Sequence, residues 1–376
     1  MAPRLLSAAV AAFCCPCLCC GSGAAIEVPG AADAGRIVSA LPPLRSGLGH
    51  ASWRIKDLDA NRLGQDYFDQ GLRLLYGFNF DQAIDAFRAA NLLDGGKCSL
   101  CLWGEAYAVG RNLNAGMELT SLPAANDALR QAEEILQAER QRGHGGEHHE
   151  AAALVAALHQ RYAVNPTTYA ASQRTLDADY ALAMRSVSRA FPENHHIATF
   201  FADALMNTMP WDYYEEGRTA VGHTLKPVAA EARQVLEGVL AAEPTHEGAI
   251  HLYIHLLEAS DDNEQAQPYA EMLAGLAPSA SHLVHMPSHT FMHTGGWAAA
   301  VRVNHEASYE AGDQIYPLHN REFLVWALRI EGRSLEALNE ARALSQLALT
   351  CADASQPCEI EGCHPPDPAV PQSRRQ

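Results

Sequence analysis

The sequence predicts an all-α fold, a solenoid of stacked helix pairs with insertions, and three observations support it. Apolar and small residues between residues 62 and 348 recur at helical spacing, as Leu236 and Leu240 do. The alternation of apolar and polar residues that marks a β-strand is absent. Pro244 and Pro278 are separated by about 34 residues, the length of one repeated helix pair. Since one such pair cannot bury its apolar face alone, several pairs must stack.

The chain begins with a segment that resembles an export or targeting signal. Arg4 precedes a mostly apolar run from Leu5 to Cys20, and small residues follow. We therefore predict that residues 1–25 direct the protein to export or to an organelle; otherwise the protein is cytoplasmic. Residues 26–61 are rich in Gly, Ala and Pro and predict a linker.

The other end of the chain predicts a disordered tail. Five prolines follow Asp353, among scattered polar residues that cannot support a packed element. The predicted tail covers residues 349–376, so the helical-repeat domain is expected over residues 62–348.

Charge and hydropathy exclude two classes of partner. The 44 acidic side chains outnumber the 27 basic ones, for a formal net charge of −17. A phosphate backbone is bound by clustered Lys and Arg, which this chain lacks, so no nucleic-acid partner is expected. No stretch after the leader reaches the roughly 20 apolar residues that a bilayer requires, so no membrane span is expected.

The repeat domain is expected to open with a helix pair whose turn is the stretch from Gly77 to Phe80. Long helices are expected between residues 122 and 190. Residues 209–227 interrupt a later pair as an insertion, and within it Trp211 and Asp212 are predicted to cover the groove as a lid.

Cys98 and Cys101 are expected to open a helix, where the positive end of the helix dipole lowers the pKa of a thiol. A structural disulfide or a pair of buried thiols is one interpretation, and a redox-active pair is another. A zinc knuckle would need two further cysteines from the tail, Cys358 and Cys363.

Five histidines recur at the repeat spacing. His251, His285 and His319 follow one another at intervals of about 34 residues, and the same interval separates His255 from His289. Residues at one repeat spacing take equivalent positions on successive helices. Such helices pack about 10 Å apart, so imidazoles from both can meet at a metal with bonds of roughly 2.0–2.1 Å. We therefore predict that His251, His255, His285, His289 and His319 hold a metal.

The donor set predicts the kind of metal and of function. Glu258 lies on the same helical face as His251 and His255. Imidazoles with one carboxylate suit a transition metal such as Cu, Zn or Fe rather than Ca or Mg. Glu258 and His319 are the candidate catalytic groups, as a proton carrier or a further ligand. The predicted function is a metal-dependent enzyme that oxidises or hydrolyses a small-molecule substrate in the groove.

A second interpretation is a scaffold that binds a peptide or protein partner in the same groove without metal. The histidines would then act as polar contacts or as a pH sensor. Haem ligation is a third interpretation. Ordinary core packing is the alternative for the aromatic residues among the predicted groove residues. These groove residues are His282, His293, Trp103, Tyr107, Asp203 and Asn207.

The remaining histidines carry no site prediction. His305 is expected at the surface of a second helix of a pair. His144, His148 and His149 lie in or beside a Gly-rich segment and are expected in a solvated loop.

Four segments carry further motifs: the stretch from Cys98 to Tyr107, the stretch from Ala204 to Asn207 with Pro210 to Asp212, an HxxxH motif from His251 to His255, and an HMPSH motif from His285 to His289. Together they resemble a group of tetratricopeptide-repeat proteins from bacteria. The likeness covers most of residues 62–348 and implies a tetratricopeptide-like solenoid whose repeated histidine positions face the concave groove. That group is largely uncharacterised, so the resemblance implies no reaction.

The third repeat departs from the pattern of this group in two places. Leu318 stands where the pattern has a proline directly before the histidine. Phe323 stands at the position that would hold a second histidine, so His319 has no partner of its own repeat.

Overall fold

The computed structural model describes four stretches of the 376-residue chain: residues 41–110, 112–162, 166–217 and 223–352. Helices are the regular elements of these stretches, and the only extended pairing described there is an isolated antiparallel bridge between Tyr214 and Leu225. The predicted all-α fold is confirmed for this part of the chain. No helix within it combines the length and apolar character needed to cross a membrane. The predicted signal, residues 1–25, and residues 353–376 of the predicted tail lie outside the described residues.

The segment from residue 42 to residue 61 packs against the helices that follow it. Gln65 Nε2 donates to the Trp53 carbonyl at 2.9 Å, and Gln65 Oε1 accepts from the Ile55 N–H at 3.3 Å. The rings of Trp53 and Trp103 meet edge-on, with centroids 6.1 Å apart. This segment differs from the linker predicted for residues 26–61, because its apolar side chains are buried and hold it in place. Those side chains are Leu48, Ala51, Trp53, Ile55 and Leu58.

The first helix pair is α2 (Arg62–Tyr76) and α3 (Phe80–Leu93), and it confirms the turn predicted from Gly77 to Phe80. The two helices cross closely at Gly71. A Cβ at this position would lie 2.7 Å from a ring carbon of Phe87, so the crossing requires glycine.

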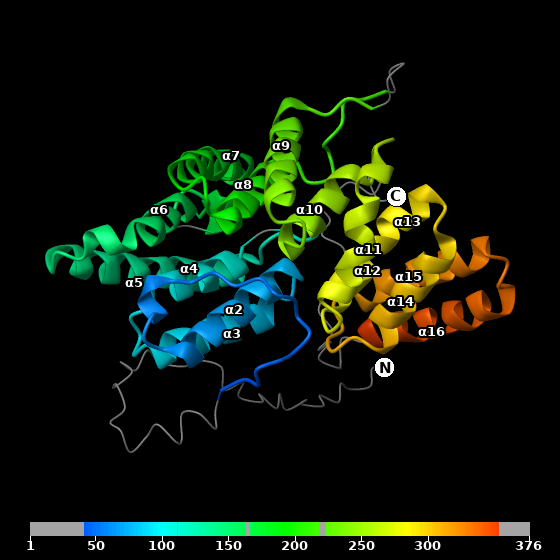
Figure 1. The fold of residues 1–376 in the computed structure, drawn as a ribbon, viewed down its shortest axis with the longest axis horizontal. Helices are drawn as coiled ribbons and strands as arrows, with labels where there is room; N and C mark the ends of the chain where they lie inside the picture. The colour runs from blue at the N-terminus through cyan, green and yellow to red at the C-terminus, as the bar shows by residue number, and fades with distance from the viewer. Residues whose placement is uncertain (1–40, 111, 163–165, 218–222, 353–376) are drawn as a thin grey trace, which may run out of the picture. The chain divides into compact units, whose positions relative to one another are not determined.

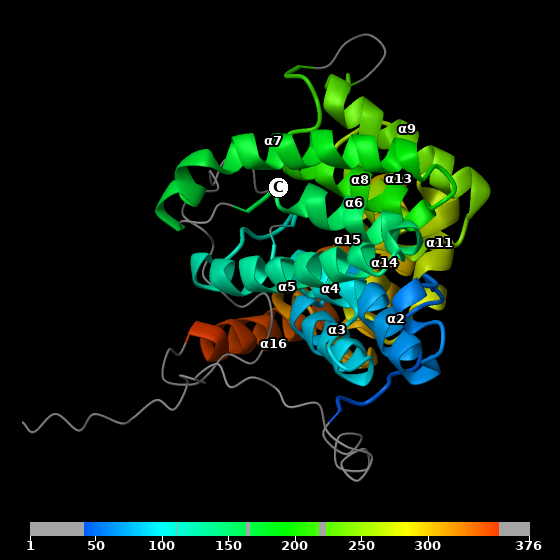
Figure 2. The same ribbon diagram turned by 90° about the vertical axis from the view of Figure 1, so that its left-hand side faces the viewer.

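The next helices include two long ones, as predicted for residues 122–190. Helices α5 and α7 have 20 and 25 residues, and α6 lies between them in contact with both (Figure 2). The helices of this part are α4 (Ser99–Ala108), α5 (Leu122–Gln141), α6 (His149–Leu158), α7 (Pro166–Ala190) and α8 (His195–Asn207).

In the predicted insertion, the described residues between α8 and the next helix, which starts at Pro227, form no helix. Trp211 Nε1 donates to the Leu113 carbonyl at 2.7 Å, and Lys226 Nζ pairs with Asp212 Oδ1 at 2.7 Å. The insertion is therefore fastened at the two residues predicted to form a lid.

From residue 227 onward, α10, α12, α13 and α15 carry the repeated histidines. Helix α14 packs on α15, and α15 packs on α16 (Figure 1). Pro287 opens α13, so the helical run through His285 and His289 is interrupted at Met286, as a proline in that place predicts. The helices are α9 (Pro227–Ala242), α10 (Glu247–Leu257), α11 (Gln267–Leu276), α12 (Ser281–His285), α13 (Pro287–Thr294), α14 (Trp297–Tyr309), α15 (Pro317–Ile330) and α16 (Ser334–Ala352).

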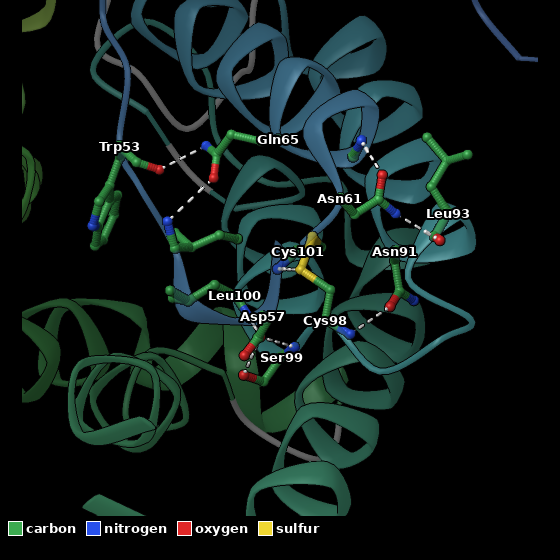
Figure 3. The surroundings of a disulfide bond; sticks show 12 residues. Trp53, Asp57, Asn61, Gln65, Asn91, Leu93, Cys98, Ser99, Leu100 and Cys101 are labelled. Carbon is green, nitrogen blue, oxygen red and sulfur yellow. Dashed lines mark hydrogen bonds between the residues drawn. A yellow bond between two sulfur atoms is a disulfide. The ribbon is translucent and has the colours of Figure 1, made fainter. Parts of the chain in front are cut away.

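A disulfide joins Cys98 and Cys101 at the start of α4 (Figure 3). Cys98 Sγ also accepts from the Cys101 N–H at 3.1 Å, and Asn91 Oδ1 accepts from the Cys98 N–H at 3.1 Å. Asp57 Oδ2 accepts from the Ser99 N–H at 2.7 Å and caps the helix start. Both cysteines are buried. The structure therefore has a buried disulfide at this position rather than a pair of free thiols.

Replacing both Cys98 and Cys101 by serine is expected to lower the free energy of unfolding by about 2 kcal/mol, the chain-entropy value for a loop of four residues. A serine hydroxyl at position 98 keeps an acceptor for the N–H of residue 101, so the variant tests the covalent bond alone. Urea titration measures the difference, and wild type under reducing conditions should reproduce the variant. Equal unfolding midpoints for variant and oxidised wild type would contradict this prediction.

Candidate metal centre

Six histidines from α10, α12, α13 and α15 gather in two groups of three. Within each group, the nitrogen atoms available to a metal lie within 4.8 Å of one another. The first triad is His251, His255 and His282, and the second triad is His285, His289 and His319.

The two triads are neighbours in one cluster of imidazole rings. The ring centroids of His255 and His289 are 5.8 Å apart, and those of His282 and His285 are 5.9 Å apart. Rings within a triad are spaced similarly, since the centroids of His255 and His282 are 6.0 Å apart. Metal ions in the two triads would therefore lie close to each other.

In the second triad, hydrogen bonds at Nδ1 fix which ring nitrogens carry protons. His285 Nδ1 lies 2.6 Å from Asn304 Oδ1, and Asn304 Nδ2 donates to the Ala300 carbonyl at 2.8 Å. His289 Nδ1 lies 3.0 Å from Glu258 Oε2. Because amide and carboxylate oxygens only accept, both imidazoles are protonated at Nδ1, and their Nε2 atoms are left to share a second proton or a metal ion. Those two Nε2 atoms face each other at 3.0 Å.

Two lone pairs at this distance repel each other unless a cation lies between them. Nε2 of His319 is also only 3.4 Å from Nε2 of His289. Two nitrogen ligands of one ion, with bonds of 2.0–2.1 Å, are about 2.9 Å apart at a right angle and about 3.3 Å apart at the tetrahedral angle. The spacings of 3.0 and 3.4 Å therefore fit nitrogen atoms that share one metal ion.

The first triad is held in a similar way. His251 Nδ1 donates to the Tyr76 carbonyl at 2.7 Å, which leaves the lone pair of its Nε2 3.1 Å from His282 Nε2. His255 Nδ1 lies 3.5 Å from Glu258 Oε2. The ring nitrogens of His255 and Nδ1 of His282 are buried without a hydrogen-bond partner. Buried polar atoms are nearly always bonded, so this deficit indicates a ligand.

Glu258 is the carboxylate shared by both triads. Its Oε2 faces Nδ1 of His255 in the first triad and Nδ1 of His289 in the second. Burial alone would raise the pKa of Glu258, but the two neighbouring imidazoles hold it below its usual value. The ionised carboxylate therefore favours the tautomer that offers Nε2 to a metal. Metal-binding histidines commonly have such an outer carboxylate.

Most of the triad histidines are neutral near pH 7. Burial lowers the pKa values of His251, His282 and His285 well below the usual value, because it penalises the charged ring. Burial and the neighbouring His289 lower the pKa of His319 to about 3. Neutral imidazole is the form that binds a metal.

A neighbouring histidine pair is satisfied without any metal. His246 Nδ1 accepts from the Ala249 N–H, so its Nε2 carries the proton and donates to His196 Nδ1 at 3.2 Å. His196 Nε2 in turn donates to the Ser52 carbonyl at 3.2 Å, and the Tyr76 hydroxyl donates to His196 Nδ1 at 2.8 Å. Each proton meets an acceptor here. The facing nitrogens of the second triad can be paired only if His285 or His289 carries a second proton, or if both bind a metal ion.

Three aromatic residues, here called the aromatic cover, close over the first triad. Phe78, Trp211 and Tyr316 have φ values of +56°, +63° and +51°, and they are the non-glycine residues with positive φ in the described chain. Phe78 packs on all three rings of the triad, Trp211 lies 5.1 Å from His255, and Tyr316 lies 4.9 Å from His282. Left-handed backbone strains such residues, and strain of this kind concentrates at functional sites.

The second triad approaches the surface at His319. This histidine is half-buried, whereas the other members of both triads are buried. Phe323 packs on the three rings of the second triad, with centroid distances of 5.0, 4.6 and 4.8 Å. Trp326 stacks on Phe323 and is 45% exposed. The second triad therefore lies nearer to solvent than the first.

All five histidines predicted as metal ligands lie in the two triads, where His282 joins them. The sequence placed His282 only in the groove, although its spacing of three residues from His285 is a helical-face signal. His293 is exposed near the end of α13, and no described contact joins it to a triad.

The other predicted groove residues are buried. Trp103 lies fully in the core, Tyr107 donates a hydrogen bond to Asp203 Oδ2, and Asn207 Nδ2 donates to the Asp203 carbonyl at 2.9 Å. Asp203 and His251 line the same small cavity of about 20 Å³, which has room for one water molecule. Of the predicted groove residues, Asp203 therefore lines a small cavity beside the first triad.

The histidines without a site prediction are mostly exposed. His305 is exposed on α14, as predicted, and His144 and His149 are exposed as well. His148 differs from the predicted solvated loop, because its Nδ1 lies 2.9 Å from Asp57 Oδ1 and its side chain is only 13% exposed. The proposed zinc knuckle falls on Cys358 and Cys363, which are outside the described residues.

Two partners of the triads have no signal in the sequence. Asn304 and the Tyr76 carbonyl hold His285 and His251, yet neither lies at the repeat spacing from a histidine. Comparison with known proteins adds no further residues: the chain matches no protein-family model and no curated protein.

Proposed function

We propose that this protein binds two transition-metal ions, one in each histidine triad, as the centre of an enzyme that acts on a small molecule. The observation that carries this proposal is the spacing of the Nε2 atoms of His285 and His289, which face each other at 3.0 Å. A cation between them removes the repulsion. The same cation can be reached by His319.

The donor atoms narrow the choice of metal. Six imidazoles with no thiolate in contact suit Cu, Zn or Fe, and Ca and Mg prefer oxygen. Three protein ligands for each ion leave at least one coordination position open, as in catalytic rather than structural sites. An ion so held can act as a Lewis acid or activate a water molecule, which supports hydrolysis, whereas oxidation would require a redox-active ion such as Cu or Fe and an external oxidant.

The metal-free peptide scaffold has weaker support. A docked peptide must reach the histidines, but five of the six are buried, the most accessible of these being 5% exposed. Burial of the histidines therefore favours the metal centre over the peptide scaffold.

We also infer that the histidine-bearing helices stack in the tetratricopeptide manner. Helices α10, α12 and α15 begin at Glu247, Ser281 and Pro317, at intervals close to the tetratricopeptide length of about 34 residues. Each is followed by a partner helix, and neighbouring helices pack in sequence order from α14 to α16. This spacing supports a tetratricopeptide-like repeat.

We propose that the protein is exported to an oxidising compartment. The disulfide between Cys98 and Cys101 supports it, because disulfides persist mainly in oxidising compartments.

Elemental analysis of the full chain, loaded with zinc and freed of excess metal, is expected to find two ions bound at the triads. His282→Ala and His319→Ala should each remove one ion, because each truncates one triad. The double variant should lose both. The difference in metal content between these variants distinguishes metal bound at the triads from metal bound elsewhere on the protein.

His305→Ala is the matched control, since its side chain is 54% exposed and contacts neither triad. It should retain the wild-type metal content. Equal metal content in wild type and in the double variant would overturn the proposed function.

A further inference from the structure

We infer that the two ions are unequal: the first triad holds a closed ion, and the second triad holds an open ion that takes a small anionic ligand. This inference rests on the proposed function. It identifies the ion that binds the substrate and the charge that the substrate carries.

The first triad is closed on the described sides. His251, His255 and His282 are each at most 2% exposed. The aromatic cover lies on these rings, and Trp211 is tied down by the hydrogen bond from its Nε1 to the Leu113 carbonyl. The adjoining cavity of about 20 Å³ admits a single water molecule. A ligand of three atoms has no room there.

The second triad is covered by Phe323, but it lies nearer to solvent than the first. His319 is half-buried, and the residue beside it, Phe323, is half-buried as well. Both side chains belong to α15, whose Trp326 next to Phe323 is 45% exposed. An exogenous ligand can therefore reach the second ion past His319 without breaking the aromatic cover.

Charge decides which ligand the open ion takes. Two divalent ions bring four positive charges, and the imidazoles around them are neutral. Glu258 is the one carboxylate in contact with the triads in the described chain, and it supplies a single negative charge. Buried charge without a counterion is costly, so the open position favours an anion. The substrate or product should thus be a small molecule that binds through an anionic atom.

Azide is the probe for this inference, because it is a small anion whose binding to copper(II) produces a charge-transfer absorption band. The full chain is loaded with copper(II), its metal content is measured, and azide is titrated. One azide per chain is expected although two ions are bound. His319→Ala should lose the open ion and with it azide binding, whereas His282→Ala should lose the closed ion and still take one azide.

Opening the aromatic cover supplies the reciprocal test. Trp211→Gly removes the indole over His255, and glycine accepts the φ of +63° without strain, so a second azide is expected. Trp326→Gly, at an exposed ring over the second triad, is the matched control and should leave the ratio at one. Two azides or none in wild type, or azide binding that survives in His319→Ala, would overturn the inference. Absence of bound copper would instead defeat the proposed function.

Discussion

The metal-free protein is expected to lose most of its stability between pH 7 and pH 5. Burial and the neighbouring His196 lower the pKa of His246 to about 3, against 6.5 for an exposed histidine. Between these two values the unfolded chain binds a proton that the folded chain excludes. The free energy of unfolding therefore falls as the pH falls below 6.5, and it goes on falling to about pH 3.

The loss in the free energy of unfolding can be estimated from His246 alone, and the other buried histidines increase it. At pH 5 a histidine whose pKa shifts from 6.5 to about 3 costs about 2 kcal/mol. Burial lowers the pKa values of His251, His282, His285 and His319 in the same direction, so their losses add. Whole domains are stable by only about 5–15 kcal/mol. The carboxyls that act in the opposite sense, with pKa values raised chiefly by burial, are fewer and include Asp203 and Glu247.

Urea titrations of chelator-treated protein at pH 7, 6 and 5 measure this loss. His246→Asn is the matched variant, since asparagine keeps an acceptor for the Ala249 N–H at the start of α10 and removes the titrating ring. It should recover about 2 kcal/mol of the loss at pH 5. Equal stability at pH 7 and pH 5 would show that the buried histidines do not control it.

Glu258→Ala is expected to weaken metal binding 10- to 100-fold at both triads at once, the usual effect of removing an outer-shell partner. The carboxylate lies 3.0 Å from His289 Nδ1 and 3.5 Å from His255 Nδ1, one histidine of each triad. Without it, both rings lose the acceptor that keeps the proton on Nδ1. Competition against a chromophoric chelator measures the two affinities.

Three variants sharpen this experiment. Glu258→Gln keeps an acceptor oxygen and should lose less affinity than Glu258→Ala. Asn304→Ala should weaken the second triad alone, because Asn304 contacts His285 and no member of the first triad. Glu271→Ala removes an exposed carboxylate on α11 and should change neither affinity. A loss confined to one triad in Glu258→Ala would show that this carboxylate is not shared.

The sequence predicted the elements that depend on local spacing. Helices follow from apolar residues three and four positions apart, and the break at Pro287 follows from the missing N–H of proline. His251 and His285 are one repeat length apart, which predicted that these histidines lie on successive helices. Each of these signals is contained in one helix or in one repeat.

The features that the sequence did not predict depend on distant contacts. Residues 42–61 resemble a linker in composition, but Trp53 is buried because Phe68 and Trp103 surround its ring. Hydrogen bonds at His251 and His285 involve a carbonyl and an amide on other helices, and no spacing rule connects them. The left-handed φ of Trp211 is likewise invisible in a list of residues, because any aromatic residue ordinarily avoids it.

The hydrogen bond between His251 and the Tyr76 carbonyl joins residues 175 positions apart. The contacts of the second triad, in contrast, lie between Glu258 and Phe323. Closing a long loop costs more entropy than closing a short one, so distant contacts form later in folding. During synthesis the second triad can assemble from α10 to α15, while the first triad is complete only once α2 docks on α10. Occupancy of the first triad by a metal would thus report that α2 has packed on α10.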